Sequence, residues 1–157
     1  MRPETSIDGV LVREVARHRD DRGWLAELFR QDELPAEFHP VMSYLSMTHP
    51  GVTRGPHEHR DQADLFVFLG PSRFQIFLWD NRPDSRSYKH HDRFEAGDSN
   101  PLLVLVPKGV VHAYRNVGSE EGLVINCPNR LYAGPGKAEP VDEIRHEEDP
   151  DGPFRIE

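Results

Sequence analysis

Apolar residues in this chain fall into short runs separated by proline, glycine and asparagine. Two runs, 65–69 and 102–106, are almost continuously apolar, which is typical of strands buried on both faces. Only 31–37 has a weakly helical pattern, and Pro35 interrupts it. The other predicted strands are shorter or mix polar and apolar positions, and they cover 10–12, 24–29, 42–47, 74–79, 110–114 and 123–125.

About eight short strands at regular turn spacing predict an all-β sandwich or barrel. A jelly roll with two packed antiparallel sheets keeps its edges short and can enclose a pocket. Periodicity alone does not distinguish it from an immunoglobulin-like sandwich. The 12 glycines and 14 prolines also suit many short strands and little helix. Because no linker or repeat divides the 157 residues, we expect a single domain over 1–157.

Charge and composition exclude several classes of protein. The net charge of −8 argues against a general nucleic-acid binder, since phosphate neutralisation supplies most of that affinity. No apolar run is long enough for a membrane helix, so no membrane partner is expected. Residues 1–8 are charged and do not resemble a signal peptide. A lone cysteine, Cys127, excludes an internal disulfide and favours a cytoplasmic location.

Histidines carry the strongest chemical signal. His57 and His59 are two residues apart, so on a strand they would point into one space. A third, His112, lies in Pro107–Asn116, which fits the PxGxxHxxxN signature of the cupin jelly roll. The motif match therefore favours the cupin form of the predicted fold.

The other cupin signature is incomplete. It requires HxH, an acid and a glycine, and the position of the acid, seven residues before Gly70, is occupied by Ala63. Asp64 lies one place further on and is expected to point to the opposite face of its strand.

A catalytic metal needs about three protein ligands and an open position. His57, His59 and His112 could hold a divalent metal, with Gln62 a poor replacement for the missing acid. The alternative, that these histidines work without a metal, stays open at this point.

Collinear segments of the chain resemble motifs of the dTDP-4-dehydrorhamnose 3,5-epimerase family of cupins. Residues 20–30 resemble DxRGFFxExF, 51–57 resemble GVLRGLH, and 107–112 resemble PxGFAHG. The resemblance implies a cupin fold, no cofactor, a homodimer, and a dTDP-linked 4-keto-6-deoxyhexose as substrate. Other matching segments are 62–70, 74–85, 131–133 and 144–150.

The resemblance also implies roles for individual residues. His57 would be the general base that removes a proton beside the C4 ketone, and Tyr132 would be the acid on the opposite face. Arg22 and Glu27 would hold the nucleotide, partly across a dimer, although they could also form a simple cross-strand pair. The residues assigned to substrate binding are Arg54, His112, Arg22, Glu27, His59, Gln62 and Asp80.

Two departures from the family pattern matter. A pocket lysine of the family is replaced by Asp64. The aspartate that orients the family's histidine would fall after Glu157, so Asp80 or an acid from 142–151 would have to replace it. Taken alone, the charge run 142–151 predicts a solvated segment.

Three functions are compatible with these observations. The first is an epimerase that acts at C3, C5 or both carbons of the sugar. The second is a metal-dependent cupin enzyme that uses the three histidines. The third is a non-catalytic module that binds a nucleotide sugar without turnover.

Overall fold

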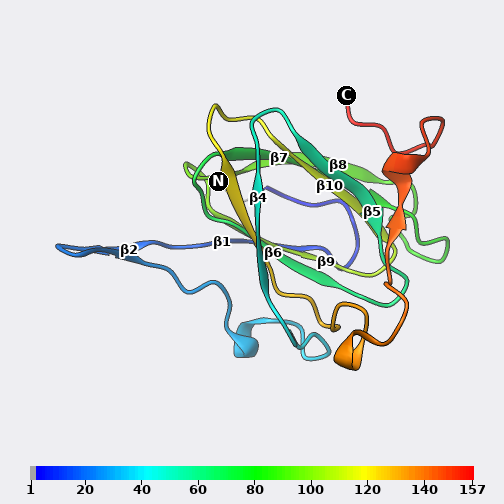
Figure 1. Cartoon of the computed structure of the whole chain (residues 1–157), viewed down its shortest axis with the longest axis horizontal. Coiled ribbons are helices and arrows are strands. Elements are labelled where there is room, and N and C mark those ends of the chain that lie inside the picture. The colour runs from blue at the N-terminus through cyan, green and yellow to red at the C-terminus, as the bar shows by residue number, and fades with distance from the viewer. Residues whose placement is uncertain (1–2) are drawn as a thin grey trace.

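Two five-stranded antiparallel sheets face each other in the computed structural model, which describes residues 3–157 (Figure 1). The predicted all-β fold with two antiparallel sheets is confirmed. The first sheet runs in the order β1 (Leu11–Glu14), β9 (Leu102–Val106), β6 (Asp64–Phe68), β11 (Gly122–Asn126) and β4 (Tyr44–Thr48). The second runs β12 (Ile144–Arg145), β5 (Thr53–Glu58), β10 (Val110–Asn116), β7 (Arg73–Asp80) and β8 (His91–Gly97).

The first sheet is covered on both faces, which explains its continuous apolar strands. Phe66 and Phe68 of β6 point between the sheets, while Leu65 and Val67 point outward into a second apolar cluster. Phe38 and neighbouring residues of the segment after β3 cover that outer cluster. All five residues of β6 and of β9 are buried, as their sequence pattern predicts.

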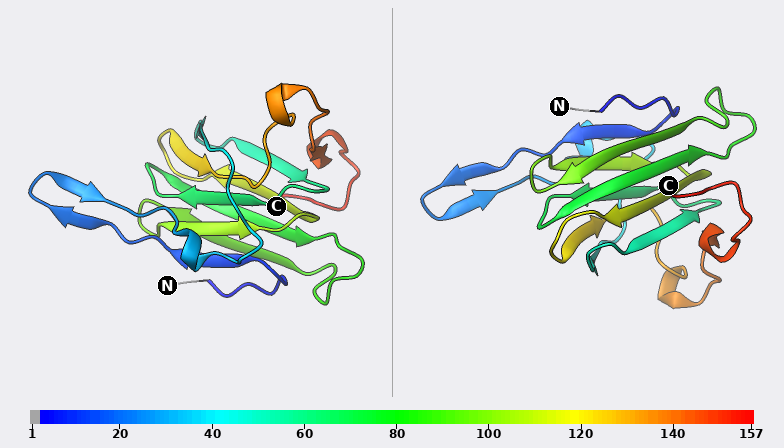
Figure 2. Two further views of the ribbon diagram at one scale, coloured as in Figure 1. Left: turned by 90° about the horizontal axis from the view of Figure 1, so that it is seen from below. Right: turned by 90° about the horizontal axis from the view of Figure 1, so that it is seen from above.

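The region around residues 18–37 differs from the prediction. Instead of a strand over 24–29, β3 covers only Gly23–Leu25 and pairs with β2 (His18–Asp20). This hairpin projects beyond both sheets (Figure 2), so no neighbouring strand extends it. The predicted helix over 31–37 is reduced to one 3₁₀ turn, Gln31–Glu33, because Pro35 cannot continue it. Two further 3₁₀ turns cover Pro135–Lys137 and His146–Glu148.

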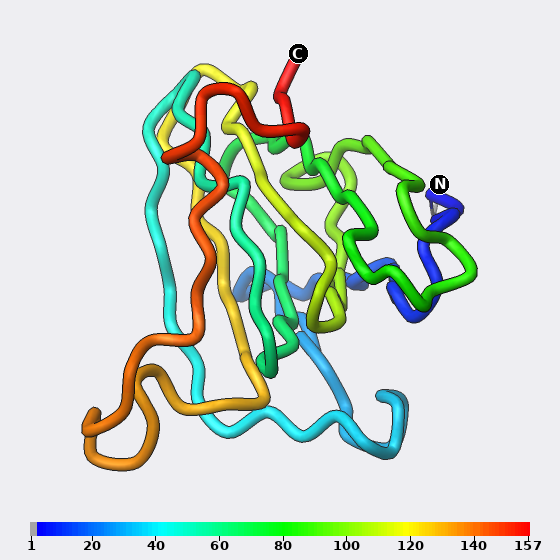
Figure 3. Tube along the Cα trace, turned by 90° about the vertical axis from the view of Figure 1, so that its right-hand side faces the viewer, coloured from blue at the N-terminus to red at the C-terminus, as the bar shows by residue number. Residues whose placement is uncertain are grey.

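Strand β5 connects distant parts of the chain. His57 on β5 lies opposite His112 on β10. Gly55 has φ 88°, and a Cβ there would lie 2.6 Å from the backbone oxygen of His112, so only glycine permits this approach. On its other edge β5 pairs with β12, which places Arg145 opposite His57. Figure 3 shows this C-terminal segment running alongside the sheet.

Three smaller points concern Cys127, membrane helices and the N-terminal segment. Cys127 is buried. No helix in residues 3–157 has the length and apolarity to cross a membrane. Met1 and Arg2 lie outside the described residues, so the expectation for the N-terminal segment is not tested there.

Candidate active site

A cavity of about 810 Å³ opens between the two sheets. Its walls come from strands β4, β5, β6 and β10 and from the segment 128–145, which ends in β12. Six of the nine residues singled out from the sequence line it, and these are Arg54, His57, His59, Gln62, His112 and Tyr132.

Asp64 points into this cavity, so the expectation that it faces the other way is wrong. Along β6, Asp64 shares its face with Phe66 and Phe68, both of which pack between the sheets. Ala63 instead packs against the outer apolar cluster. Because side chains alternate along a strand, Asp64, and not residue 63, supplies the carboxylate.

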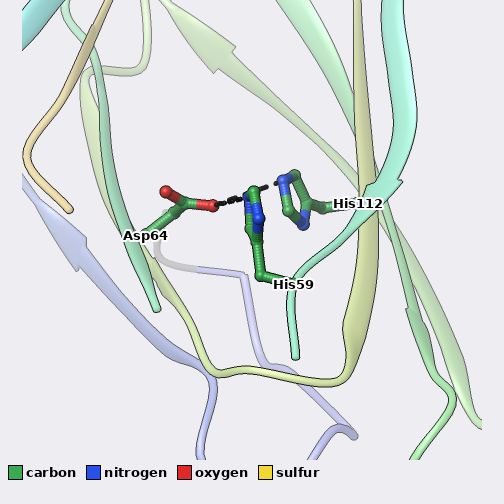
Figure 4. Close-up of side chains that lie close together, drawn as sticks. All are labelled: His59, Asp64 and His112. Atoms are coloured by element: carbon green, nitrogen blue, oxygen red, sulfur yellow. Dashed lines mark ion pairs between the residues drawn. The ribbon is translucent and has the colours of Figure 1, made fainter. Parts of the chain in front are cut away.

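Three side chains, of which Asp64 and His112 are buried and His59 is partly buried, converge at the cavity wall (Figure 4). The Oδ2 atom of Asp64 lies 3.0 Å from His59 Nε2 and 3.5 Å from His112 Nε2. Burial alone disfavours the charged form of each group, but at Asp64 the contacts with His59, His112 and Asn126 together outweigh burial and lower the pKa to about 2. At His59 the contacts with Asp64 and Asp142 together outweigh burial and raise the pKa to about 9. At His112 burial prevails and lowers the pKa to about 4.

His57 lies beside this cluster and is held by acids of the C-terminal segment. Its Nε2 atom lies 2.6 Å from Glu147 Oε1, and its Nδ1 atom lies 3.6 Å from Glu143 Oε1. Pairing of β12 with β5 brings both acids to the ring, and an ion pair of 2.7 Å between His146 and Glu58 fastens the segment. The prediction that 142–151 is merely solvated is therefore wrong, and its alternative, that an acid of this run contacts the histidine, agrees with the geometry.

Asp142 forms a second attachment of the same segment. Its carboxylate accepts hydrogen bonds of 2.8–2.9 Å from the backbone amides of residues 60–62. Its backbone oxygen accepts a hydrogen bond from Nδ1 of His59. The turn that follows β5 and the cavity wall are thus fixed together.

Two tyrosines line the cavity in different environments. Tyr132, the acid implied by the family resemblance, is 57 % exposed. Tyr44 is 46 % exposed, but its hydroxyl accepts a hydrogen bond of 2.8 Å from Asn126 Nδ2, and desolvation raises the pKa of Tyr44 to about 12. Arg54 also lines the cavity, where its guanidinium donates to Thr48 Oγ1 and to the backbone oxygen of Met47.

Three predicted site residues lie elsewhere in the described chain. Asp80 does not line the cavity and does not orient a histidine, because its carboxylate is bonded to Arg82, Ser85 and Ser87. Arg22 pairs with Asp20 on the projecting hairpin, and Glu27 pairs with Arg30. The two residues therefore do not form the cross-strand pair considered from the sequence.

The metal-ligand set expected from the sequence also needs correction. Among the described residues, the ligand atoms that converge within 4.8 Å of one another belong to His59, Asp64 and His112. His57 is not a member, and its Nε2 atom instead lies within hydrogen-bond distance of Glu147.

Three residues in or beside the cavity, Asp64, Tyr44 and Glu147, were not predicted as site residues from the sequence. The alternation with Phe66 and Phe68 could have identified Asp64, and the strand pattern of 44–48 could have placed Tyr44 on the cavity side. Nothing in the local sequence identifies Glu147, because its role depends on pairing with a strand about 90 residues earlier.

Comparison with known proteins places the chain in a family. The family described as dTDP-4-dehydrorhamnose 3,5-epimerase matches residues 4–139. The spore coat polysaccharide biosynthesis protein SpsL of Bacillus subtilis is 43 % identical over 126 residues, which cover 80 % of this chain and 82 % of SpsL. The probable low-salt glycan biosynthesis epimerase Agl13 of Haloferax volcanii is 38 % identical, with 81 % of each chain covered.

Solved structures agree on the fold. A dTDP sugar isomerase from Desulfovibrio desulfuricans superimposes with a TM-score of 0.81 at 20 % identity. The superposition covers 95 % of this chain and 91 % of the isomerase chain. At that identity the likeness concerns the cupin-type fold alone. The extent of the family match and the identity to SpsL carry the assignment, and they confirm the resemblance seen in the motifs. The chain belongs to the dTDP-4-dehydrorhamnose 3,5-epimerase family.

Proposed function

We propose that this protein epimerises a dTDP-linked 4-keto-6-deoxyhexose, with His57 as the general base. The observation that carries the proposal is the position of His57, which lines the cavity while its Nε2 atom lies 2.6 Å from Glu147. Glu143 lines the cavity and Glu147 does not, so Nδ1 is the ring nitrogen on the cavity side. With Nε2–H donating to Glu147, Nδ1 carries the lone pair that accepts the substrate proton.

The chemistry follows from the ketone at C4. Removal of a proton from C3 or C5 leaves an electron pair that moves onto the C4 oxygen and forms an enolate. Preorganised donors or positive charge around that oxygen lower the barrier. Arg54 supplies positive charge at the cavity wall, and His59 and Gln62 are placed among the polar lining groups.

Inversion requires that the proton return from the opposite face of the sugar. Tyr132 is the acid that the family resemblance implies, and its place in the cavity lining supports this role. Tyr44 is a second phenol in the same cavity. Replacing each by phenylalanine separates them, since loss of the acid slows inversion but leaves proton removal by His57 intact.

The test is hydrogen exchange at C3 and C5. Incubation of dTDP-4-keto-6-deoxyglucose with the protein in heavy water should introduce deuterium at one or both carbons, observed by NMR. We expect His57→Asn to lower the exchange rate by at least about 100-fold, as for removal of a general base. The same carbons report whether one or both positions are epimerised.

The opposite result is equally informative. If wild-type protein and His57→Asn give the same trace without deuterium, the epimerase proposal is wrong. Thermal stabilisation by dTDP in that case would favour a binding module without turnover.

A homodimer is part of the proposal. The projecting hairpin and the segment after it expose Trp24, Leu25 and Phe29, and a two-fold partner would cover such a surface. Arg22 and Glu27 on this arm would then reach the partner's cavity, as the family resemblance implies. Sedimentation equilibrium of wild type and Trp24→Ser tests this, and a monomeric wild type would contradict it.

A further inference from the structure

A buried carboxylate, a buried histidine and a partly buried histidine direct three ligand-type atoms at one another beside the cavity (Figure 4). The atoms are Nε2 of His59, Oδ2 of Asp64 and Nε2 of His112, and all lie within 4.8 Å of one another. They come from the turn after β5, from β6 and from β10, so both sheets contribute.

Backbone carbonyl groups fix the tautomer of both histidines. Nδ1 of His112 lies 3.1 Å from the backbone oxygen of Val110, and Nδ1 of His59 contacts the backbone oxygen of Asp142. A carbonyl oxygen only accepts, so each Nδ1 carries a hydrogen. A neutral ring then has its lone pair on Nε2, which is the arrangement found in metal-bound histidines.

The carboxylate of Asp64 is bonded on one side only. Its Oδ1 atom accepts hydrogen bonds of 2.9 Å each from Gln62 Nε2 and Asn126 Nδ2. Its Oδ2 atom is buried and lacks a hydrogen bond of acceptable geometry, and the side chain is 1 % exposed. A buried carboxylate oxygen without a completed partner calls for a specific explanation.

Protonation of His59 alone does not give both Asp64 Oδ2 and His112 Nε2 a partner. It would place an N–H toward Asp64, but the lone pair of His112 Nε2 would still face Oδ2 at 3.5 Å. Two buried acceptors that face each other are costly. A cation that accepts electron pairs from all three atoms removes the conflict.

The distances also suit a metal. Bonds of about 2.0–2.1 Å in tetrahedral geometry separate neighbouring ligand atoms by about 3.3 Å. The two separations from Oδ2, 3.0 Å and 3.5 Å, lie on either side of that value. All three residues line the cavity, which leaves the fourth position open to a bound molecule.

The geometry points to a site for a divalent transition metal of the zinc type, held by His59, Asp64 and His112. Gln62 and Asn126 orient the carboxylate, and the carbonyls of Val110 and Asp142 orient the imidazoles. If the proposed epimerase function also holds, the metal would polarise the C4 oxygen as a Lewis acid. Its position suits this, since the rings of His57 and His112 are 6.3 Å apart.

Metal binding by the untagged full chain tests the site without any substrate. Protein freed of metal by a chelator is titrated with Zn²⁺ by calorimetry and with Co²⁺ by visible absorption. We expect one ion per chain and the intense visible bands of four-coordinate Co²⁺. Asp64→Asn keeps the shape and the contact with Gln62, and it should weaken Zn²⁺ binding by at least about 100-fold, since even outer contacts account for 10–100-fold.

Two further variants control this result. His91→Ala removes an exposed histidine on β8 and should bind Zn²⁺ as wild type does. Should Asp64→Asn not fold, His59→Gln provides the same comparison, with circular dichroism to check the fold. Wild type that fails to retain one Zn²⁺, or ligand variants that bind it equally well, would overturn the site.

The result is separable from the proposed function. Zinc binding without deuterium exchange in the loaded protein would leave the metal site standing and remove the epimerase. Deuterium exchange by a chain that binds no Zn²⁺ would support the epimerase and remove the metal site.

Discussion

Asp64 and Asp80 are both buried carboxylates at a strand end, yet their surroundings differ. Asp80, the last residue of β7, accepts five hydrogen bonds, from the backbone and guanidinium of Arg82 and from the hydroxyls of Ser85 and Ser87. Asp64, the first residue of β6, accepts two such bonds on Oδ1, while Oδ2 has none and faces two imidazole nitrogens.

The contrast separates a structural carboxylate from a functional one. Burial opposes ionisation of Asp80, but its partners outweigh burial and hold the pKa of its carboxyl well below the usual range. These partners all come from the loop that follows the same strand, so the Asp80 carboxylate stabilises that loop. Asp64 depends on residues from other strands, and its open oxygen lies at a cavity. A buried group with unsatisfied hydrogen-bonding capacity, such as Asp64, is therefore a better indicator of function than a fully bonded one, such as Asp80.

The largest effect we expect on stability is that of Asp80→Asn. The amide cannot accept all five hydrogen bonds and leaves Arg82 without its charged partner. Removing one member of a buried pair costs about 3–5 kcal/mol, and we expect about 3 kcal/mol because Arg82 is partly exposed. Thermal denaturation should show Tm lower by roughly 6–12 °C.

The matched control for this variant is Asp84→Asn, an exposed acid in the same loop. It should leave Tm within about 1 °C of wild type, as for most surface changes. Equal stability of Asp80→Asn and wild type would contradict the structural role of Asp80.

The next largest effect should be the change with pH in the Tm difference between wild type and Asp80→Asn. The pKa of Asp80 is lower in the folded chain than its unfolded value of about 3.9. Its stabilisation is therefore complete above about pH 5 and is lost as pH falls through the folded pKa. The difference in Tm between wild type and Asp80→Asn should be constant from pH 5 to 7 and narrow below pH 4. A difference that widens on acidification would refute this assignment.

Glu147 differs from both aspartates, because its side chain is 33 % exposed whereas theirs are buried. Glu147→Gln keeps a hydrogen-bond acceptor for His57 but removes the charge that stabilises the protonated ring. Since solvent screens the pair, we expect the deuterium-exchange rate to fall only about tenfold, with KM unchanged. Glu148→Gln, its exposed neighbour, should exchange at the wild-type rate. A rate for Glu147→Gln equal to that of this control would show that the contact with His57 has no part in catalysis.

A smaller stability change than that of Asp80→Asn is expected for Asp64→Asn. The amide loses the ion pair with His59, but His59, unlike Arg82, can release its proton, so no uncompensated charge stays buried. The free energy of unfolding of the metal-free variant, from urea denaturation, should be lower than that of metal-free wild type by about 1–2 kcal/mol. A loss as large as that of Asp80→Asn would mean that Asp64 is also structural, and the comparison would fail.

Much of the fold could be predicted from local patterns. The runs 65–69 and 102–106 are central strands because continuous apolar sequence suits a sheet covered on both faces. The hairpin of β2 and β3 was predicted poorly, because its exposed tip carries no apolar alternation. The motifs around His57 and His112 located the cavity, since β5 and β10 pair at these two residues.

The sequence by itself determined the strand-rich fold, the family, and the histidines that line the cavity. Only the tertiary structure decided which carboxylates meet them. Local alternation relates Asp64 to Phe66 and Phe68, but the sheet that covers them decides which face is inside. Glu147 reaches His57 only because β12 pairs with β5. Contacts between residues far apart in the chain follow from strand pairing, which no local pattern specifies.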